Sequence, residues 1–389
     1  MSFPRLLEGA LRQRAEQYPV VTVTGPRQAG KTTLCRSTFA GYAYANLERP
    51  DLREFAQSDP RGFLAGLPSD GVVLDEIQRV PELLSWIQVA VDERPRPGAY
   101  ILTGSHGFDL MASIGQSLAG RTALLQLLPM SMAELRAAGI DGSTDRLLYA
   151  GGYPRIHADG LNPSVALGDY FATYVERDLR QLIELRNLDE FRRFVRLAAG
   201  RVGQVLNLQG LAGDVGVSGH TAKAWMGLLE ASFIVRRLTP WFSNLGKRLV
   251  KSPKLYFCDV GLACWLLGIT DEAQLAAHPL RGPLFENLVV MEFVKHALHQ
   301  GLPVGLHYYR DSAGLEVDLL VEQGLPPGRL GLVEVKAGLT VHGEQLRPLH
   351  RVAALLGERV ARQMLVYGGS ENWLRDGVEV VGLHAQARR

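Results

Sequence analysis

The sequence has 389 residues, of which 47% are hydrophobic and 21% are charged, so it can form two or three packed domains, and wholesale disorder is excluded. Its 42 basic and 40 acidic residues nearly balance, which excludes binding of nucleic acid through net charge alone. Three cysteines cannot form a disulfide framework, and no uncharged run reaches the roughly 18 apolar residues of a membrane span. We expect a soluble cytoplasmic protein that has no membrane partner.

The first 150 residues alternate short apolar runs with helical segments. Strands are expected at 18–25, 43–47, 71–76, 99–105 and 122–130. Helices are expected at 4–17, after the glycine-rich loop at 25–32, and at 48–67, 81–93 and 108–120. This alternation predicts an α/β domain with a mostly parallel sheet covered on both faces.

The residues after 150 have a different texture. Residues 151–255 are expected to form a long helical connector at 165–200 and then a winged helix-turn-helix, with a short helix at 209–213, a second helix after Ser218 and a returning strand. The segment 256–389 is expected to form a second α/β domain, in the order helix, three strands, helix, strand.

A phosphate-binding loop follows the first predicted strand. The residues from Gly25 to Thr32 fit the pattern G-x-x-x-x-G-K-[ST] without a mismatch. Only seven of the 42 basic residues are lysine, so a lysine inside a motif is a stronger signal in this chain than in most. We expect Lys31 to contact the β- and γ-phosphates of a nucleotide and the Thr32 hydroxyl to hold Mg²⁺. The predicted nucleotide-binding residues are Gly25, Pro26, Arg27, Gln28, Ala29, Gly30, Lys31, Thr32, Thr33, Asp75 and Ser105.

Two acids end the strand at 71–76. Asp75 is expected to reach Mg²⁺, and Glu76 is placed to orient and deprotonate an attacking water, which favours a hydrolase over a nucleotide switch. Thr103 and Ser105 end the next strand, where a polar group can sense the γ-phosphate. Arg121 is a candidate arginine finger acting on a neighbouring subunit, with a plain surface arginine as the alternative.

These segments resemble a known family. The set GPRQAGKTT, LDEIQ, ILTGS and LAGR resembles bacterial and archaeal ATP-binding proteins that join an AAA-type ATPase domain to a C-terminal domain of unknown function. The segments YVERDL, YFCDVGLACWLLG, LFENLVVMEF, EVDLLVE and VEVK extend the resemblance over nearly the whole chain. It implies an AAA-type core with one additional strand between the phosphate-loop strand and the Asp75–Glu76 strand.

A second set of charged residues lies near the C-terminus. Glu334 and Lys336 share one face of a predicted strand, Asp318 lies on the preceding strand, and Glu286 lies on the helix before it. This pattern resembles the PD-(D/E)xK nuclease core, in which carboxylates bind Mg²⁺ or Mn²⁺ and the lysine acts on water and phosphate. Glu286, Asp318 and Glu334 are therefore candidate metal ligands, and Lys336 is a candidate catalytic residue. The alternative is an inactive nuclease-like fold used for docking.

The sequence thus predicts an Mg-dependent ATPase that acts on DNA and forms a homo-oligomer. The predicted winged helix would dock DNA, and the basic cluster Lys247, Arg248, Lys251 and Lys254 is either a phosphate-contacting wing or a solvated turn. The rival interpretation is a nucleotide-switched DNA-binding regulator whose nuclease fold is inactive.

Overall fold

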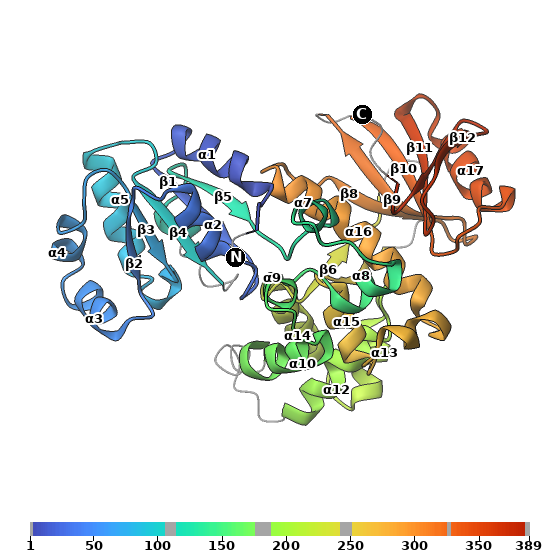
Figure 1. The fold of residues 1–389 in the computed structure, drawn as a ribbon, viewed down its shortest axis with the longest axis horizontal. Coiled ribbons are helices and arrows are strands. Elements are labelled where there is room, and N and C mark those ends of the chain that lie inside the picture. Colours follow the sequence, from blue (N-terminus) through green and yellow to red (C-terminus); the bar gives the residue numbers. More distant parts are fainter. Residues whose placement is uncertain (1–2, 106–113, 176–187, 242–250, 325–327, 386–389) are drawn as a thin grey trace.

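The computed structural model describes residues 3–105, 114–175, 188–241, 251–324 and 328–385. Parts of two predicted helices (108–113 and 176–187) and the basic residues Lys247 and Arg248 lie outside these ranges. Figure 1 shows the chain passing from an N-terminal α/β part through a helical part to a C-terminal sheet.

The N-terminal part is built on a five-stranded parallel sheet in the order β2-β3-β4-β1-β5. Its strands are β1 (Val20–Thr24), β2 (Ala43–Asn46), β3 (Val72–Asp75), β4 (Tyr100–Gly104) and β5 (Thr122–Gln126). Strand β4 lies between β1 and β3, as the family resemblance implies. Because the strands are parallel, the phosphate loop after β1 and the acids that end β3 meet at the same edge of the sheet.

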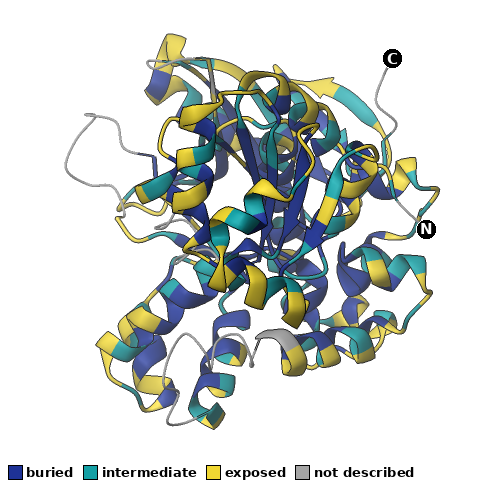
Figure 2. Ribbon diagram, turned by 90° about the vertical axis from the view of Figure 1, so that its left-hand side faces the viewer, coloured by how far each residue is buried: buried dark blue, intermediate teal, exposed yellow. Residues whose placement is uncertain are grey.

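Two hydrophobic cores flank this sheet. One contains residues of α1 (Leu7–Gln17) and α2 (Lys31–Thr38), and the other contains residues of α5 (Leu83–Glu93). Strands β1, β3 and β4 are accordingly buried along most of their length, and Figure 2 shows buried strands in the middle of the molecule. The single helix predicted at 48–67 is two helices, α3 (Pro50–Ser58) and α4 (Pro60–Ala65). The break occurs because Pro60 disfavours a helical residue before it and Asp59 caps the second helix through the Gly62 amide.

The middle of the chain is mainly helical and has one large core. This core collects residues from α7 (Met132–Ala137) through α16 (Arg281–His299). The other helices in this part are α8 (Thr144–Ala150), α9 (Pro154–Ala158), α10 (Pro163–Tyr170), α12 (Leu188–Ala199), α13 (Leu208–Val215), α14 (Gly219–Ala231) and α15 (Val260–Leu266). Ser218 caps α14 by accepting from the Thr221 amide.

A two-stranded antiparallel sheet follows α14. It consists of β6 (Val235–Leu238), which was predicted, and β7 (Lys254–Phe257), which was not. Trp225 packs edge-on against Phe191 and Phe194 in the core of the helical part. Trp241 packs in the core of the C-terminal sheet.

The C-terminal part is a six-stranded mixed sheet in the order β12-β13-β11-β10-β9-β8. Its strands are β8 (Leu306–Arg310), β9 (Glu316–Gln323), β10 (Arg329–Lys336), β11 (Val360–Tyr367), β12 (Asn372–Arg375) and β13 (Val378–Gly382). Helix α16 (Arg281–His299) precedes the sheet, and α17 (Arg347–Leu356) packs on it. The predicted order of helix, three strands, helix and strand is present, with β12 and β13 as additions.

Helix α16 connects all three parts of the molecule. It contacts α1 and β5 of the N-terminal part, α8 and β7 of the middle part, and β10 of the C-terminal sheet. This helix, which runs through the centre of the molecule in Figure 1, places residues of each part near one another.

Candidate functional sites

The phosphate loop has the backbone conformation that its glycines permit. Gly25 has φ +150°, and a Cβ atom there would lie 2.1 Å from the Leu127 carbonyl oxygen. Gly30 has φ +94° and begins α2, so the first free N–H groups of this helix face the loop. Gln28 is also left-handed, with φ +59°, which is unusual for a residue other than glycine. The loop is therefore shaped to present backbone N–H groups to an anion.

Lys31 lies beneath this loop with only 5% of its surface exposed. Its ammonium donates to the carbonyl oxygens of Gly25 (3.0 Å) and Pro26 (2.8 Å). Burial lowers the pKa of Lys31 to about 8, although the charges of Glu76 and Asp75 partly oppose this shift. A buried cation that hydrogen-bonds only to neutral groups is poised to bind an anion.

Asp75 is held by three hydroxyl groups. The Thr32 hydroxyl donates to Oδ1 and the Tyr44 hydroxyl donates to Oδ2, each at 2.8 Å, and Thr103 also donates to Oδ1. The structure thus brings Thr32 and Asp75 together, as their predicted shared role toward Mg²⁺ requires. The contact of Tyr44, from β2, with Asp75 was not predicted, because nothing in the sequence indicates which side chain of β2 reaches the end of β3.

Glu76 has a strained backbone and a constrained side chain. It has φ +59° and ψ +47°, a left-handed conformation that costs free energy for a residue with a side chain. Its Oε2 accepts from Gln78 and from the Ser105 hydroxyl (3.2 Å), and its amide donates to Thr103 (3.2 Å). Ser105, which is predicted to sense the γ-phosphate, therefore hydrogen-bonds to the Glu76 carboxylate.

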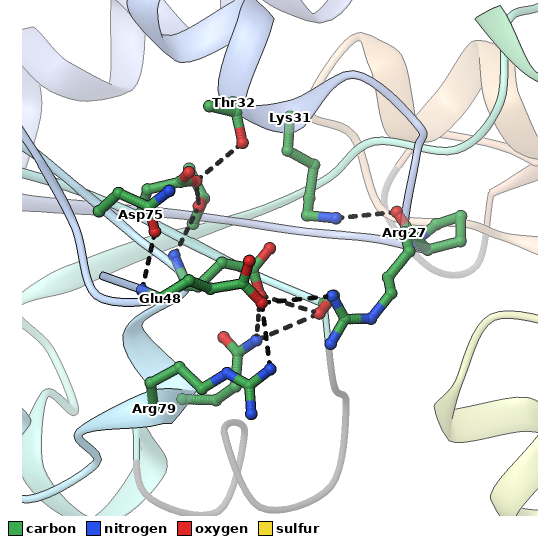
Figure 3. A network of polar contacts seen from close by, with 12 residues as sticks. Arg27, Lys31, Thr32, Glu48, Asp75 and Arg79 are labelled. Atoms are coloured by element: carbon green, nitrogen blue, oxygen red, sulfur yellow. Dashed lines mark hydrogen bonds and ion pairs between the residues drawn. The ribbon is translucent and has the colours of Figure 1, made fainter. Parts of the chain in front are cut away.

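A cavity of about 450 Å³ opens at this site. It is lined by Arg27, Gln28, Lys31–Thr33 and Glu76, and also by Pro154 and Arg155 of α9. Arg27 of this lining pairs with Glu48 (3.7 Å), which also pairs with Arg79 (3.0 Å), as Figure 3 shows. The helical part of the molecule therefore supplies one wall of the nucleotide-sized cavity.

Arg5 hydrogen-bonds to the backbone of the phosphate loop. Its guanidinium donates to the carbonyl oxygens of Ala29 (2.5 Å) and Leu128 (2.7 Å) and pairs with Glu134 at 3.1 Å. Glu134 in turn lies 3.4 Å from Nδ1 of His299 at the end of α16. The sequence did not reveal this buried cluster, because its members are more than 120 residues apart and carry no local pattern.

Arg121 lies far from the phosphate loop of its own chain. It immediately precedes β5, and Thr122 pairs with Val20 at the start of β1, whereas the loop follows the end of β1. Its guanidinium forms two hydrogen bonds with Asp92, at 2.6 and 2.8 Å. Arg121 therefore does not contact the cavity in its own chain, and its predicted action on a neighbouring subunit stays a prediction.

A second charged cluster forms where α16 meets β9 and β10. Asp318 and Glu334 are both buried, and the Asp318 carboxylate accepts from the Val335 amide at 2.9 Å. Lys336 donates to Glu334 at 2.6 Å. Burial and then the charge of Asp318 raise the pKa of both Glu286 and Glu334 above the usual glutamate range. The four residues predicted from the sequence thus lie near one another.

Lys254 occupies the centre of this cluster. Its ammonium lies 2.9 Å from Glu286, 2.5 Å from Glu316 and 3.5 Å from Asp318. The sequence-based placement of Lys254 in an exposed basic cluster is wrong, because only 2% of its surface is exposed. Glu316 was also missed, although it shares a strand face with Asp318.

The carboxylates do not surround an open cation position. Throughout the described ranges, no group of three or more His, Cys, Asp or Glu side chains is arranged to hold a metal ion. At the C-terminal cluster the physical reason is the Lys254 ammonium, which lies among the carboxylates. The predicted ligands Glu286, Asp318 and Glu334 do not fit a metal ion while Lys254 is in place.

Three family models match successive parts of the chain. An AAA domain matches residues 17–136, a domain of unknown function (DUF8612) matches 142–273, and another (DUF4143) matches 281–385. The chain is 35% identical over 379 residues to the uncharacterized protein Rv2008c of Mycobacterium tuberculosis and, equally, to Mb2031c of Mycobacterium bovis. Each alignment covers 95% of this chain and 81% of the relative. The chain belongs to the same family as these two mycobacterial proteins.

The AAA domain contains the phosphate loop, Asp75, Glu76 and Arg121, and the DUF4143 domain contains most of the second cluster. Lys254 is supplied to that cluster by the DUF8612 region. No helix in the described part of the chain combines the length and apolar character needed to cross a membrane.

Solved structures with some likeness include a Walker-type ATPase of Pyrococcus abyssi, with 15% identity and a TM-score of 0.43 over 67% of this chain and 94% of that one. Another is a variant of RuvB from Thermotoga maritima, with 19% identity and a TM-score of 0.31 over 60% of this chain and 86% of that one.

Proposed function

We propose that this protein is an Mg-dependent ATP hydrolase whose nucleotide cycle acts on DNA. The observation that carries the ATPase assignment is Lys31, a buried ammonium that donates to two carbonyl oxygens and lines a 450 Å³ cavity, which Glu76 also lines. The cavity combines anion-binding backbone, a cation and a carboxylate that can act as a base, which is the set that phosphoanhydride hydrolysis needs.

Each residue has a defined task in this proposal. The backbone N–H groups of the loop and Lys31 would bind the phosphates, and Thr32 and Asp75 would hold Mg²⁺, which supplies charge neutralisation when bound. Glu76 would take a proton from water, and its hydrogen bonds to Gln78 and Ser105 hold its carboxylate toward the cavity.

The assignment is tested by ATP turnover in Glu76→Gln. We expect this variant to bind ATP as the wild type does but to turn over at least about 100-fold more slowly, because an amide cannot accept the proton. Glu82→Gln, which changes an exposed carboxylate at the start of α5, is the matched control and should keep wild-type turnover. Equal rates in the wild type and Glu76→Gln would reject Glu76 as the base.

The DNA-binding part of the proposal rests on the middle of the chain. The succession of α12, α13, α14 and the β6–β7 pair supports a winged helix-turn-helix. Exposed Lys223 on α14 and Lys251 before β7 are available to contact phosphates. Changing both to Ala should reduce the salt dependence of binding to linear duplex DNA by about two units of slope. An unchanged slope would place the DNA contacts elsewhere.

The C-terminal domain supports two proposals. Its order of elements, with Asp318, Glu334 and Lys336 on adjacent strands, supports a PD-(D/E)xK-like fold. A nuclease of this kind would use Mg²⁺ or Mn²⁺, and the cation position is occupied by Lys254. This observation favours the second candidate, a nucleotide-switched DNA-binding regulator with an inactive nuclease fold. Incubation with linear, nicked and branched DNA, with either metal and with or without ATP, distinguishes the two.

We also place the protein in the cytoplasm as a homo-oligomer. Cys35, Cys258 and Cys264 are all buried free thiols, which fits a reducing compartment. Oligomerisation would let Arg121 reach the cavity of a neighbouring subunit, since it does not reach its own. Mixing Arg121→Ala with Lys31→Ala subunits should then restore part of the turnover, and no recovery at any ratio would contradict this role.

A further inference from the structure

The second charged cluster is assembled from four structural elements. Glu286 comes from α16, Glu316 and Asp318 come from β9, and Glu334 comes from β10. Lys254 reaches them from β7, which belongs to a different sheet. Asp318 and Glu334 are buried and Glu286 and Glu316 are partly buried, so these carboxylates repel one another, and a cation among them offsets the repulsion.

The Lys254 ammonium satisfies three of these carboxylates at once. An ammonium has three N–H donors, and three carboxylates lie within 4.0 Å of Nζ. Burial alone would lower the pKa of Lys254, but the charges of Glu286, Asp318 and Glu316 outweigh burial and raise the pKa well above its usual value. The position of Nζ among three carboxylates thus makes Lys254 the counter-ion of this cluster.

The surrounding residues hold Lys254 in this position. Its backbone pairs with Leu238 in the β6–β7 sheet, so the strand cannot slide without breaking that pairing. The Tyr256 hydroxyl donates to the same Glu286 oxygen at 2.6 Å, and the Tyr308 ring lies 5.6 Å from the ammonium. The position of the cation is therefore set by the fold and not by a flexible surface side chain.

We infer that Lys254 is a built-in substitute for a metal ion and that it excludes divalent cations from this cluster. A divalent cation binds carboxylate oxygens at roughly 2.0–2.6 Å, so it would have to occupy the space in which the Lys254 ammonium lies. Repulsion between the two positive charges adds to this overlap. The inference goes beyond the proposed ATPase and does not rest on it, since none of these residues lines the nucleotide cavity.

The remaining charges of the cluster agree with an internal cation. Lys336 pairs with Oε1 of Glu334, and Arg310 pairs with Glu316 at 3.1 Å. Oε2 of Glu334 is buried without a hydrogen-bond partner. The cluster therefore retains one unsatisfied acceptor, which a metal ion could use once the Lys254 ammonium is removed.

The test measures Mn²⁺ binding to the nucleotide-free full-length protein. The electron paramagnetic resonance signal of free Mn²⁺ reports how much of the metal is bound. Wild-type protein and Asp318→Asn should bind Mn²⁺ identically, because the cluster contributes nothing. Lys254→Met should bind one more Mn²⁺ ion than the wild type, with a dissociation constant of about 1 mM or tighter. The double variant Lys254→Met/Asp318→Asn should not bind this additional ion. Lys336→Met is the matched control, since it removes a lysine at the edge of the cluster and should gain no site.

Thermal unfolding provides a second readout. Mn²⁺ should raise the melting temperature of Lys254→Met but not that of the wild type, because only the variant has a site to fill. If Lys254→Met does not fold, Lys254→Met/Glu316→Gln removes one partly buried negative charge along with the lysine, and Mn²⁺ binding by this double variant supports the inference equally.

Two results would overturn the inference. Mn²⁺ binding by the wild type that Asp318→Asn abolishes would show that Lys254 does not exclude metal. A folded Lys254→Met, or its double variant with Glu316→Gln, that binds no additional Mn²⁺ would show that the cluster is no cation position. ATP turnover of the same preparations separates either result from a failure of the ATPase proposal.

Discussion

The two charged sites of this protein each contain a buried lysine, but the lysines have opposite surroundings. Lys31 donates to two backbone carbonyl oxygens, and burial lowers its pKa to about 8. Lys254 contacts three carboxylates, whose charges overcome burial and raise its pKa. Both lysines are buried, but among the described residues Lys31 has no carboxylate hydrogen-bonded to it, whereas the charge of Lys254 is already neutralised by its carboxylate partners.

The difference shows what each site is prepared to bind. An ammonium held by neutral groups gains most when a phosphate arrives, because the ligand supplies the missing charge. An ammonium held by carboxylates gains little from any ligand and contributes instead to the integrity of the fold. The following expectations test this contrast.

The largest effect is expected for the stability of Lys254→Met. Removing the cation leaves buried carboxylates without compensation, which costs about 3–5 kcal/mol in unfolding free energy. Urea denaturation at pH 8 measures this loss, and Lys223→Met, on the exposed face of α14, is the control. The loss should shrink at pH 5, because burial raises the pKa of Glu286 to about 7 and its protonated carboxyl group needs no cation. A loss no larger than that of Lys223→Met would contradict the neutralising role.

Lys31→Met should behave in the opposite way. It should weaken ATP binding at least about 100-fold, since charge-assisted hydrogen bonds to the phosphates are lost. Its unfolding free energy should not fall appreciably, because the ammonium makes no hydrogen bond to a carboxylate. Calorimetric titration with ATP and urea denaturation measure the two quantities, and Lys336→Met should retain wild-type affinity. If Lys31→Met were strongly destabilised but still bound ATP as the wild type does, the proposed difference between Lys31 and Lys254 would be wrong.

The pH dependence of ATP binding is the third expectation. Lys31 is neutral above about pH 8 in the free protein, and bound phosphate would favour its protonated form. ATP binding should therefore take up a proton above pH 8, and affinity should fall by about tenfold per pH unit there. Calorimetry at pH 8.5 in buffers of different ionisation enthalpy measures the uptake, which Lys31→Met should lack.

The same shift has a defined sign for stability. The unfolded chain protonates Lys31 up to its usual pKa of 10.5, whereas the folded protein does not above about pH 8. The unfolded state thus binds more protons in this window, so the Lys31 contribution to unfolding free energy increases as the pH rises through it. A contribution that decreased with pH in this window would contradict the lowered pKa.

The smallest effect is expected for Arg121→Ala. Its pair with Asp92 is exposed, and such pairs often contribute nothing measurable to stability. The urea midpoint and the ATP affinity should stay at wild-type values, while turnover falls only in assembled protein. Asp92→Ala is the control, because it breaks the same pair without removing the arginine. A large fall in ATP affinity would show that Arg121 acts within its own chain.

Much of the N-terminal fold could be predicted because its signals are local. Short apolar runs predicted all five strands of the parallel sheet, and the glycine pattern predicted where the loop would enter α2. The break between α3 and α4 also has a local signal, the dipeptide Asp59–Pro60. The turn between β12 and β13 also has a local sequence signal, the dipeptide Asp376–Gly377. Both residues have positive φ in the structure, as this type of hairpin turn requires.

The parts that could not be predicted depend on distant contacts. Lys254 follows Lys247 and Lys251 in the sequence, so it was grouped with exposed basic residues, although Leu255 and Phe257 indicate a buried strand. Its three carboxylate partners come from helix α16 and strand β9, 32 to 64 residues later. The contact of Arg5 with Ala29, Glu134 and Leu128 depends on how whole elements pack, which no local spacing encodes.

Helix α16 gives these two sites a shared rigid element. Near its start it carries Glu286 of the acidic cluster, and at its end it carries His299, which faces Glu134 and, through it, the Arg5 that holds the Ala29 carbonyl. His299 lies 13 residues after Glu286, so the two are about 20 Å apart along one unbroken helix. A single continuous helix therefore joins the residues that support the phosphate loop to the carboxylates around Lys254.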